Sequence, residues 1–228
     1  MTTTKFMDHP DIEIYFDEIF PLIIQESDRG AVLLGVSYID EKLNLLFKDL
    51  LPSGISNKRR KDIFSYTGPF GGISSKLDVA LVCRLLPEDL IRAINLLRKI
   101  RNSIAHDVTH FCLEDHKQRL SEILELIGEK VYEAVNDIAL SAMLDKLIKK
   151  FTSAPHPTET DKPLFESEES ALTYIRGNEE IKGILREQRL RWEVGIGVGL
   201  ICGLILFHKD KTLSWLGDSG VISGLISD

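Results

Sequence analysis

Residues 87–106, PEDLIRAINLLRKIRNSIAH, decide the fold class of this chain. Apolar residues recur in this stretch at three- and four-residue steps, which places them on one face of an α-helix. The residues of this face are Leu90, Ile94, Leu97, Ile100 and Ile104. Pro87, followed by Glu88 and Asp89, is typical of a helix start, with proline in the first turn and carboxylates near the positive end of the dipole. The stretch predicts an amphipathic helix that ends near His106.

The same periodicity extends over the first 150 residues. Further helices are predicted over 10–25, from a cap at Ser27 to residue 50, from Ser74 or Ser75 through Leu81, and over 114–151. We interpret residues 57–72 as a loop, because a basic run is followed there by several glycines. No pair of strands of useful length appears. The sequence therefore predicts an all-α protein, an antiparallel helical bundle.

The predicted domain organisation has three parts. Residues 1–151 form the helical domain, and residues 152–167, with prolines among Ser, Thr and acidic residues, form a linker. Residues 168–228 form a C-terminal tail that begins with a charged helix over 168–192. The first eleven residues contain no apolar run, so we expect no secretory signal peptide and a helical domain in the cytoplasm.

One apolar stretch in the tail allows two interpretations. Residues 194–207 carry no charge and lie within a candidate membrane segment, 192–208. The run is shorter than the roughly 20 residues of a usual span, but Gly195, Gly199 and Gly203 have the spacing that lets membrane helices approach closely. More Lys and Arg precede the run than follow it, which would hold the large domain at the inner face of a membrane. The alternative is a segment buried within a soluble protein, for which the alternation of glycine with Val and Ile, including Gly197, would suit a strand or hairpin.

Charge and cysteine content exclude several classes of function. The net charge of −7 argues against a surface that coats nucleic acid, and no basic recognition helix appears, so we expect no direct DNA binding. A local basic site remains compatible with this balance. Cys83, Cys112 and Cys202 have no paired spacing, and His110 and His116 show no ligand geometry, so we expect neither a disulfide framework, a metal site nor a cofactor.

The most informative side chains lie at the end of the 87–106 helix. Asn102 and His106, four residues apart, share a helix face, and Arg101 projects from a neighbouring direction. Histidine can move a proton near neutral pH, arginine can stabilise a pentacoordinate phosphorane, and asparagine can orient either group. The alternative is structural: the histidine lies at the negative end of the helix dipole, and Arg101 pairs with Asp107 or another carboxylate.

Several motifs in order resemble the MltR-like family, which is named after the mannitol operon repressor. They are ESDRGA at 26–31, YIDEKL at 38–43, GPFG at 68–71 with SKL at 75–77, and IRNSIAH at 100–106. The resemblance covers roughly residues 25–122 and leaves out the tail. It includes Asp28, Arg29, Asp40 and Glu41, which we interpret as ion pairs that hold helices together.

The last motif is also similar to the R-x4-H signature of HEPN domains (higher eukaryotes and prokaryotes nucleotide-binding). Many of these are metal-independent ribonucleases that act as homodimers, often as toxins or antiviral effectors. The resemblance implies that Arg101 and His106 are the catalytic pair, with Asn102 beside them, in a cleft between two copies. RNA phosphates would then contact nearby cations, for which the candidates are Arg98, Lys99, Lys58, Arg59 and Arg60.

Two functions from different classes follow. The first is a HEPN-like endoribonuclease, a toxin or defence effector that binds RNA as a dimer. The second is an MltR-like transcriptional regulator that acts through a protein partner without catalysis.

Overall fold

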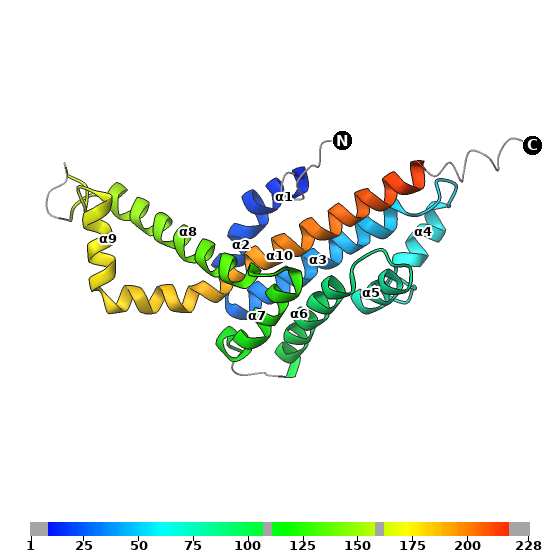
Figure 1. The fold of residues 1–228 in the computed structure, drawn as a ribbon, viewed down its shortest axis with the longest axis horizontal. Helices are drawn as coiled ribbons and strands as arrows, with labels where there is room; N and C mark the ends of the chain where they lie inside the picture. The colour runs from blue at the N-terminus through cyan, green and yellow to red at the C-terminus, as the bar shows by residue number, and fades with distance from the viewer. Residues whose placement is uncertain (1–8, 107–110, 158–161, 219–228) are drawn as a thin grey trace, which may run out of the picture.

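The computed structural model describes residues 9–106, 111–157 and 162–218, and these residues form an all-α fold (Figure 1). Among them the nearest approach to a β-sheet is an isolated bridge between Pro155 and Pro163. The predicted all-α class is confirmed. The helices pack on one another, and the long C-terminal helix is buried against two of them.

The helices follow one another along the chain with short connections. In order they are α1 (Pro10–Ile14), a π-helical segment (Tyr15–Ile19), α2 (Phe20–Gln25), α3 (Asp28–Asp49), α4 (Asn57–Phe64), α5 (Ile73–Val82), α6 (Glu88–His106), a 3-10 turn (Leu113–His116), α7 (Lys117–Ile127), α8 (Val131–Ser153), α9 (Glu168–Gly177) and α10 (Glu179–Asp218). The helix predicted over 87–106 is confirmed as α6, and its apolar face is buried as expected.

The core is organised around α10 and α3. Helix α10 has 40 residues, which corresponds to a length of about 60 Å. Asp28, the first residue of α3, pairs with Arg191, and Asp49, its last residue, pairs with Lys209. Helix α3 therefore runs parallel to α10 along residues 191–209. The antiparallel arrangement predicted for the bundle does not hold for this pair, because the intervening helices bring the chain back before α10 begins (Figure 1).

The glycines of α10 allow close approach to aromatic rings. A Cβ atom on Gly199 would lie 2.7 Å from the Tyr15 ring, and one on Gly195 would lie 2.7 Å from the Phe20 ring. The Tyr15 hydroxyl donates a hydrogen bond to the Gly195 carbonyl at 2.5 Å. Two glycines of the four-residue spacing thus serve protein packing in this structure.

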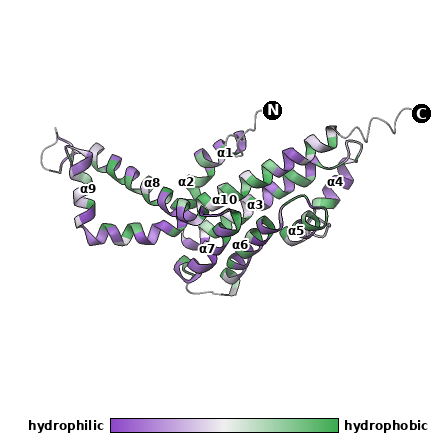
Figure 2. Ribbon diagram, viewed as in Figure 1, coloured by the Kyte–Doolittle hydropathy of each residue, from purple (hydrophilic) through white to green (hydrophobic). Residues whose placement is uncertain are grey.

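The buried apolar part of α10 bears on the two interpretations of residues 194–207. Residues 179–217 are long and apolar enough to cross a membrane, and 78% of their most apolar window is buried within the protein. Figure 2 shows the hydrophobic middle of α10 beside α3, whereas the beginning of the helix is hydrophilic. The burial agrees with the second interpretation, but the segment is a helix and not a strand or hairpin. The membrane anchor stays a prediction. The domain boundaries at 151 and 168 also stay predictions, although α10 shares its core with the first 106 residues.

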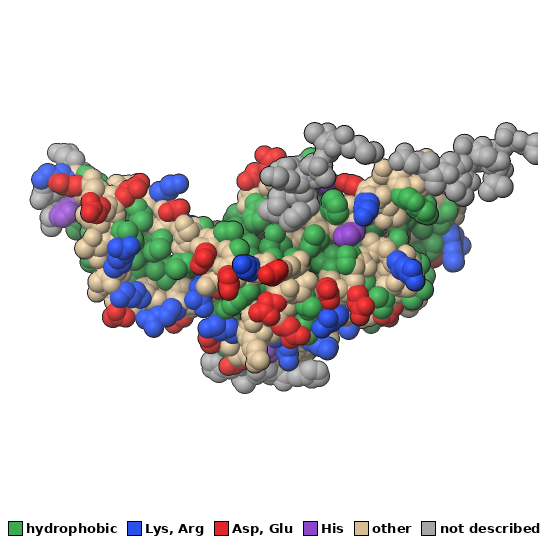
Figure 3. Space-filling model, viewed as in Figure 1, with side chains coloured by type: hydrophobic (Ala, Val, Ile, Leu, Met, Phe, Trp, Pro, Cys, Tyr) green, Lys and Arg blue, Asp and Glu red, His purple; other side chains and the backbone are tan. Residues whose placement is uncertain are grey.

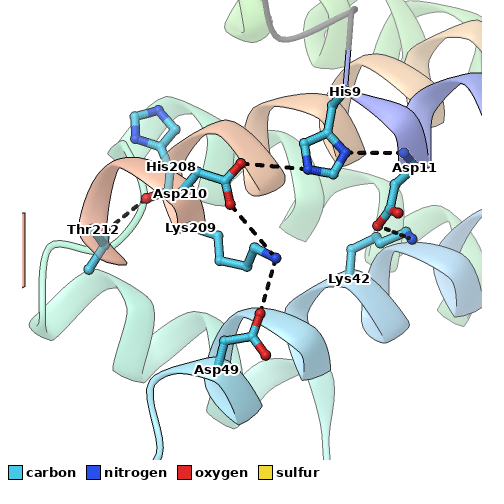
Figure 4. A network of polar contacts seen from close by, with 8 residues as sticks. All are labelled: His9, Asp11, Lys42, Asp49, His208, Lys209, Asp210 and Thr212. Carbon is cyan, nitrogen blue, oxygen red and sulfur yellow. Dashed lines mark hydrogen bonds and ion pairs between the residues drawn. The ribbon is translucent and has the colours of Figure 1, made fainter. Parts of the chain in front are cut away.

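A polar network fixes the far end of α10 to the start of the chain (Figure 4). His9 accepts a hydrogen bond from the Asp11 backbone N–H, and its Nε2 lies 3.5 Å from an Asp210 oxygen. Lys209 Nζ lies 3.0 Å from Asp49 of α3, and Lys42 Nζ lies 3.1 Å from Asp11. The network therefore joins α1, α3 and α10.

The single helix predicted over 114–151 is wrong. The structure has α7 and α8 there, separated at Gly128. Helix α7 ends at Ile127, where Gly128 adopts an extended conformation, and Lys130, left-handed with φ 63°, then redirects the chain before Val131. The apolar repeat continues across this break, so periodicity alone did not reveal it.

Two further boundaries differ from the prediction. Residues 57–72 are not all loop: Ser56 accepts a hydrogen bond from the Arg59 N–H and caps α4, which carries the basic run. The helix predicted over 168–192 stops at Gly177, where Asn178 caps the next helix by accepting from the Ile181 N–H. Helix α10 then continues without a break through the apolar segment.

Candidate functional site

The residues of the R-x4-H motif lie in the last turns of α6. Arg101 and Asn102 are exposed, and Arg101 Nη1 donates to Asn102 Oδ1 at 3.4 Å. His106 is the last residue of α6, and its side chain lies outside the described residues, as does Asp107. The arginine is thus free of any ion pair within the described part of the chain.

A pocket of about 390 Å³ lies beside Arg101 and Asn102. Three helices form it, and its lining residues are Val36, Ser37 and Asp40 of α3, Gly72, Ile73 and Ser74 at the start of α5, and Arg98, Arg101 and Asn102 of α6. The site therefore brings together three of the predicted residues, Arg98, Arg101 and Asn102, on one wall of a cavity.

The start of α5 adds backbone donors to this pocket. Gly72 occupies the cap position and offers no side chain to bond the first N–H groups of the helix. Arg98 Nη1 donates to the Ser74 hydroxyl, and Arg98 Nε is buried without a hydrogen-bond partner among the described residues. These donors and the positive end of the helix dipole favour an anion.

The carboxylate in the pocket is already neutralised. Asp40 Oδ1 lies 2.6 Å from Nζ of Lys76, whose side chain is 2% exposed. A buried lysine is tolerated when a carboxylate pairs with it at short range, and losing either partner leaves an uncompensated charge. Asp40 is thus ion-paired across α3 and α5, and its structural role stays a prediction.

The remaining predicted cations do not line this pocket. Lys99 is exposed on α6. Lys58, Arg59 and Arg60 are exposed on α4, which Figure 1 places beside the end of α3, far from the end of α6. Any contact between these side chains and a ligand of the pocket would require a ligand that extends over several helices.

The other predicted ion-pairing residues lie at the start and middle of α3. Asp28 accepts a hydrogen bond from the Leu113 N–H at 2.9 Å and pairs with Arg191 Nε at 3.3 Å. Arg191 also donates to the Glu26 carbonyl, so Asp28 joins α3, α10 and the segment after α6. Arg29 is half-buried, and Glu41 is exposed without an ion pair in the described part of the chain.

Sequence reasoning missed Ser74 and the buried Glu193. The pair Gly71-Gly72 before Ser74 was a usable signal, because an uncapped glycine start exposes backbone donors. Glu193 is 1% exposed between α6, α7 and α10, with Arg189 Nε 3.0 Å from its Oε1. Burial raises the pKa of Glu193, against the opposing effects of Arg189 and Lys117.

Within the described ranges, no group of three His, Cys, Asp or Glu side chains is placed to hold a metal ion. Cys83 and Cys112 are exposed and Cys202 is buried, all as free thiols. Comparisons with family models, curated proteins and solved structures find no match for this chain.

Proposed function

We propose that the protein is a HEPN-like, metal-independent endoribonuclease that acts as a homodimer. Arg101, Asn102 and His106 would form its reaction site at the end of α6. The observation that carries the proposal is the pocket beside this helix end, where Arg98, Arg101, Asn102 and Ser74 gather hydrogen-bond donors.

A phosphodiester suits this arrangement. Arginine binds phosphate oxygens through paired, permanently charged donors. The Ser74 hydroxyl and the first N–H groups of α5 can donate hydrogen bonds to a second phosphate oxygen or to the neighbouring phosphate of the RNA. The apolar floor made by Val36 and Ile73 offers a surface on which a sugar or base can lie.

The reaction would be transphosphorylation. The 2′-hydroxyl attacks the adjacent phosphorus as His106 takes its proton, and the bond from phosphorus to the 5′-oxygen breaks as that oxygen gains a proton. Arg101 stabilises the charge on the phosphorane. The products are a 2′,3′-cyclic phosphate and a 5′-hydroxyl. In the proposed homodimer, two copies of the chain would supply two imidazoles, one as base and one as acid.

The test is RNA cleavage by purified full-length protein. His106→Ala and Arg101→Ala should each lower the cleavage rate by about 100-fold or more, because each removes a group that acts in the transition state. Arg92→Ala is the matched control, since Arg92 is an exposed arginine of the same helix that pairs with Asp89. An RNA with a 2′-deoxy nucleotide at the cleavage position should resist all of these proteins.

Equal cleavage by the wild type and His106→Ala, with unchanged helical circular dichroism, would overturn the proposal. It would favour the alternative function, a regulator that acts through protein contacts without catalysis.

A further inference from the structure

The structure contains a second concave surface, far from the end of α6, between α8 and the first part of α10. Figure 1 shows the two helices meeting near α2 and diverging toward α9, which joins them. A groove of about 700 Å³ lies between them. Trp192 packs at one end with Ile24 and Met143, and the mutually tilted rings of Phe151, Phe165 and Tyr174 lie toward the other. We call this feature the α8–α10 groove.

Two helical stripes face each other across the α8–α10 groove. The stripe of α10 has the spacing i, i+3, i+4 and i+11, and consists of Ile181, Ile184, Leu185 and Trp192. The stripe of α8 has apolar residues four apart, Met143, Leu147 and Phe151. Such stripes normally pack against a third helix. Here Ile184 remains 47% exposed, so the described part of the chain provides no helix to cover it.

The charged side chains that line the groove are all positive. Lys146 and Lys150 alternate with the apolar residues of α8, and no carboxylate lines the groove. Arg191 is already engaged by Asp28 and the Glu26 carbonyl. Neither lysine makes an ion pair within the described ranges, and Lys146 Nζ lies 5.8 Å from the Trp192 ring centroid. Figure 3 shows hydrophobic side chains on this arm, with Lys and Arg side chains along its lower edge and Asp and Glu side chains elsewhere on it.

The dimensions of the α8–α10 groove indicate what kind of molecule it can hold. The α10 stripe spans eleven residues, about 17 Å, which matches roughly three turns of a second helix. A volume of 700 Å³ is within the range of roughly 300–1,000 Å³ of ligand pockets, and it accommodates the side chains of one helix face while the helix backbone stays outside. An extended nucleic acid would need more cations than two free lysines.

We propose that the α8–α10 groove binds an acidic amphipathic helix of a partner protein. The apolar face of that helix, at i, i+3, i+4 and i+7, lies between the two stripes. Its flanking Glu and Asp side chains pair with Lys146 and Lys150, which selects acidic partners and speeds their association. The proposal is independent of the ribonuclease activity, because none of these residues lines the pocket at Arg101.

The test uses a labelled synthetic helix with leucines at these positions and glutamates elsewhere. A second peptide keeps the leucines and replaces every glutamate with lysine. Fluorescence anisotropy with the full chain should give binding to the acidic peptide that is at least about tenfold tighter than binding to the basic one.

The protein variants separate charge from apolar contact. Lys150→Glu should weaken binding of the acidic peptide by about tenfold, whereas Lys149→Glu should change it by less than about twofold. Lys149 is the matched control, since it is exposed on the same helix and lies outside the groove. Ile184→Glu, at a half-exposed position that tolerates charge, should also abolish tight binding.

Two results would overturn the proposal. One is equal affinity for the acidic and basic peptides, or equal effects of the Lys150 and Lys149 substitutions. The other is a combined result in which the acidic peptide fails to bind and light scattering finds an oligomer that Lys150→Glu dissociates. The groove would then hold a second copy of this chain.

Discussion

The two halves of α10 belong to one uninterrupted helix but have opposite surroundings. Residues 193–206 are buried on nearly every side by α3, the N-terminal helices and α7. Residues 179–191 touch neighbours on part of one side only, and leave Ile184 and several charged residues exposed. The comparison shows that one helix can serve as the centre of a core and as one wall of a recognition groove. Substitutions at matched positions in the two halves should therefore have different effects.

The largest difference is expected for removal of an isoleucine side chain. Ile201→Ala should lower the free energy of unfolding by about 3–4 kcal/mol, because Ile201 is fully buried and its loss leaves a cavity. Ile184→Ala should lower it by less than about 1 kcal/mol, since Ile184 is 47% exposed. Urea denaturation followed by circular dichroism measures both. Similar losses for the two variants would remove the distinction between the halves.

Adding a methyl group should affect the two halves in opposite directions. Gly199→Ala should destabilise the fold by about 1–2 kcal/mol, because its Cβ would lie within 3 Å of both Tyr15 and Phe16. Gly183→Ala meets open space on α10 and should raise stability by about 0.5–1 kcal/mol through helix propensity. The shift in urea midpoint should therefore change sign between them. A stabilising Gly199→Ala would mean that the aromatic rings do not pack closely against α10.

The smallest effect concerns pH and lies where the two halves meet. Burial raises the pKa of Glu193 in the folded protein above its value in the unfolded chain. The folded state therefore favours the protonated side chain, and the free energy of unfolding falls as the pH rises through the folded pKa. The groups that face it are Arg189, Lys117 and Glu114. Glu193→Gln should lose less stability than the wild type as the pH rises above about 4, where a glutamate of the unfolded chain begins to ionise.

Unfolding titrations at a series of pH values test this prediction. Glu187→Gln, at an exposed position of the same helix, is the control and should follow the wild type. Parallel pH profiles for all three proteins would contradict the assignment of the effect to Glu193.

Those helices whose apolar spacing and caps are local features of the sequence were predicted correctly. The apolar face of α6 and the Ser27 cap of α3 were visible, because spacing and capping chemistry act within a few residues. The break over residues 128–130 was missed because the apolar residues on either side, Ile127 and Val131, keep the four-residue spacing of a helix. The continuity of α10 was also missed, since its glycines weaken a helix locally and only contact with Tyr15 and Phe20 explains them.

The candidate site was predicted in part. Arg98, Arg101 and Asn102 share a wall of one pocket, as neighbours on a helix can be expected to do. The contribution of Ser74 required knowing that α5 begins against α6, and that depends on packing between segments 24 residues apart. Lys58 was assigned to the site because of its charge alone. The charge of a side chain does not determine on which helix, or on which side of the protein, it lies.

The parallel pairing of α3 with α10 has a consequence for synthesis of the protein. Tyr15 and its acceptor Gly195 are 180 residues apart, so at roughly 5–20 residues per second the ribosome needs roughly 9–36 s to supply the second after the first. During that interval the apolar faces of α2 and α3 have no α10 to cover them. The nascent chain therefore presents an aggregation-prone surface, and a message truncated before residue 193 would yield a product for chaperones and proteases rather than a smaller functional protein.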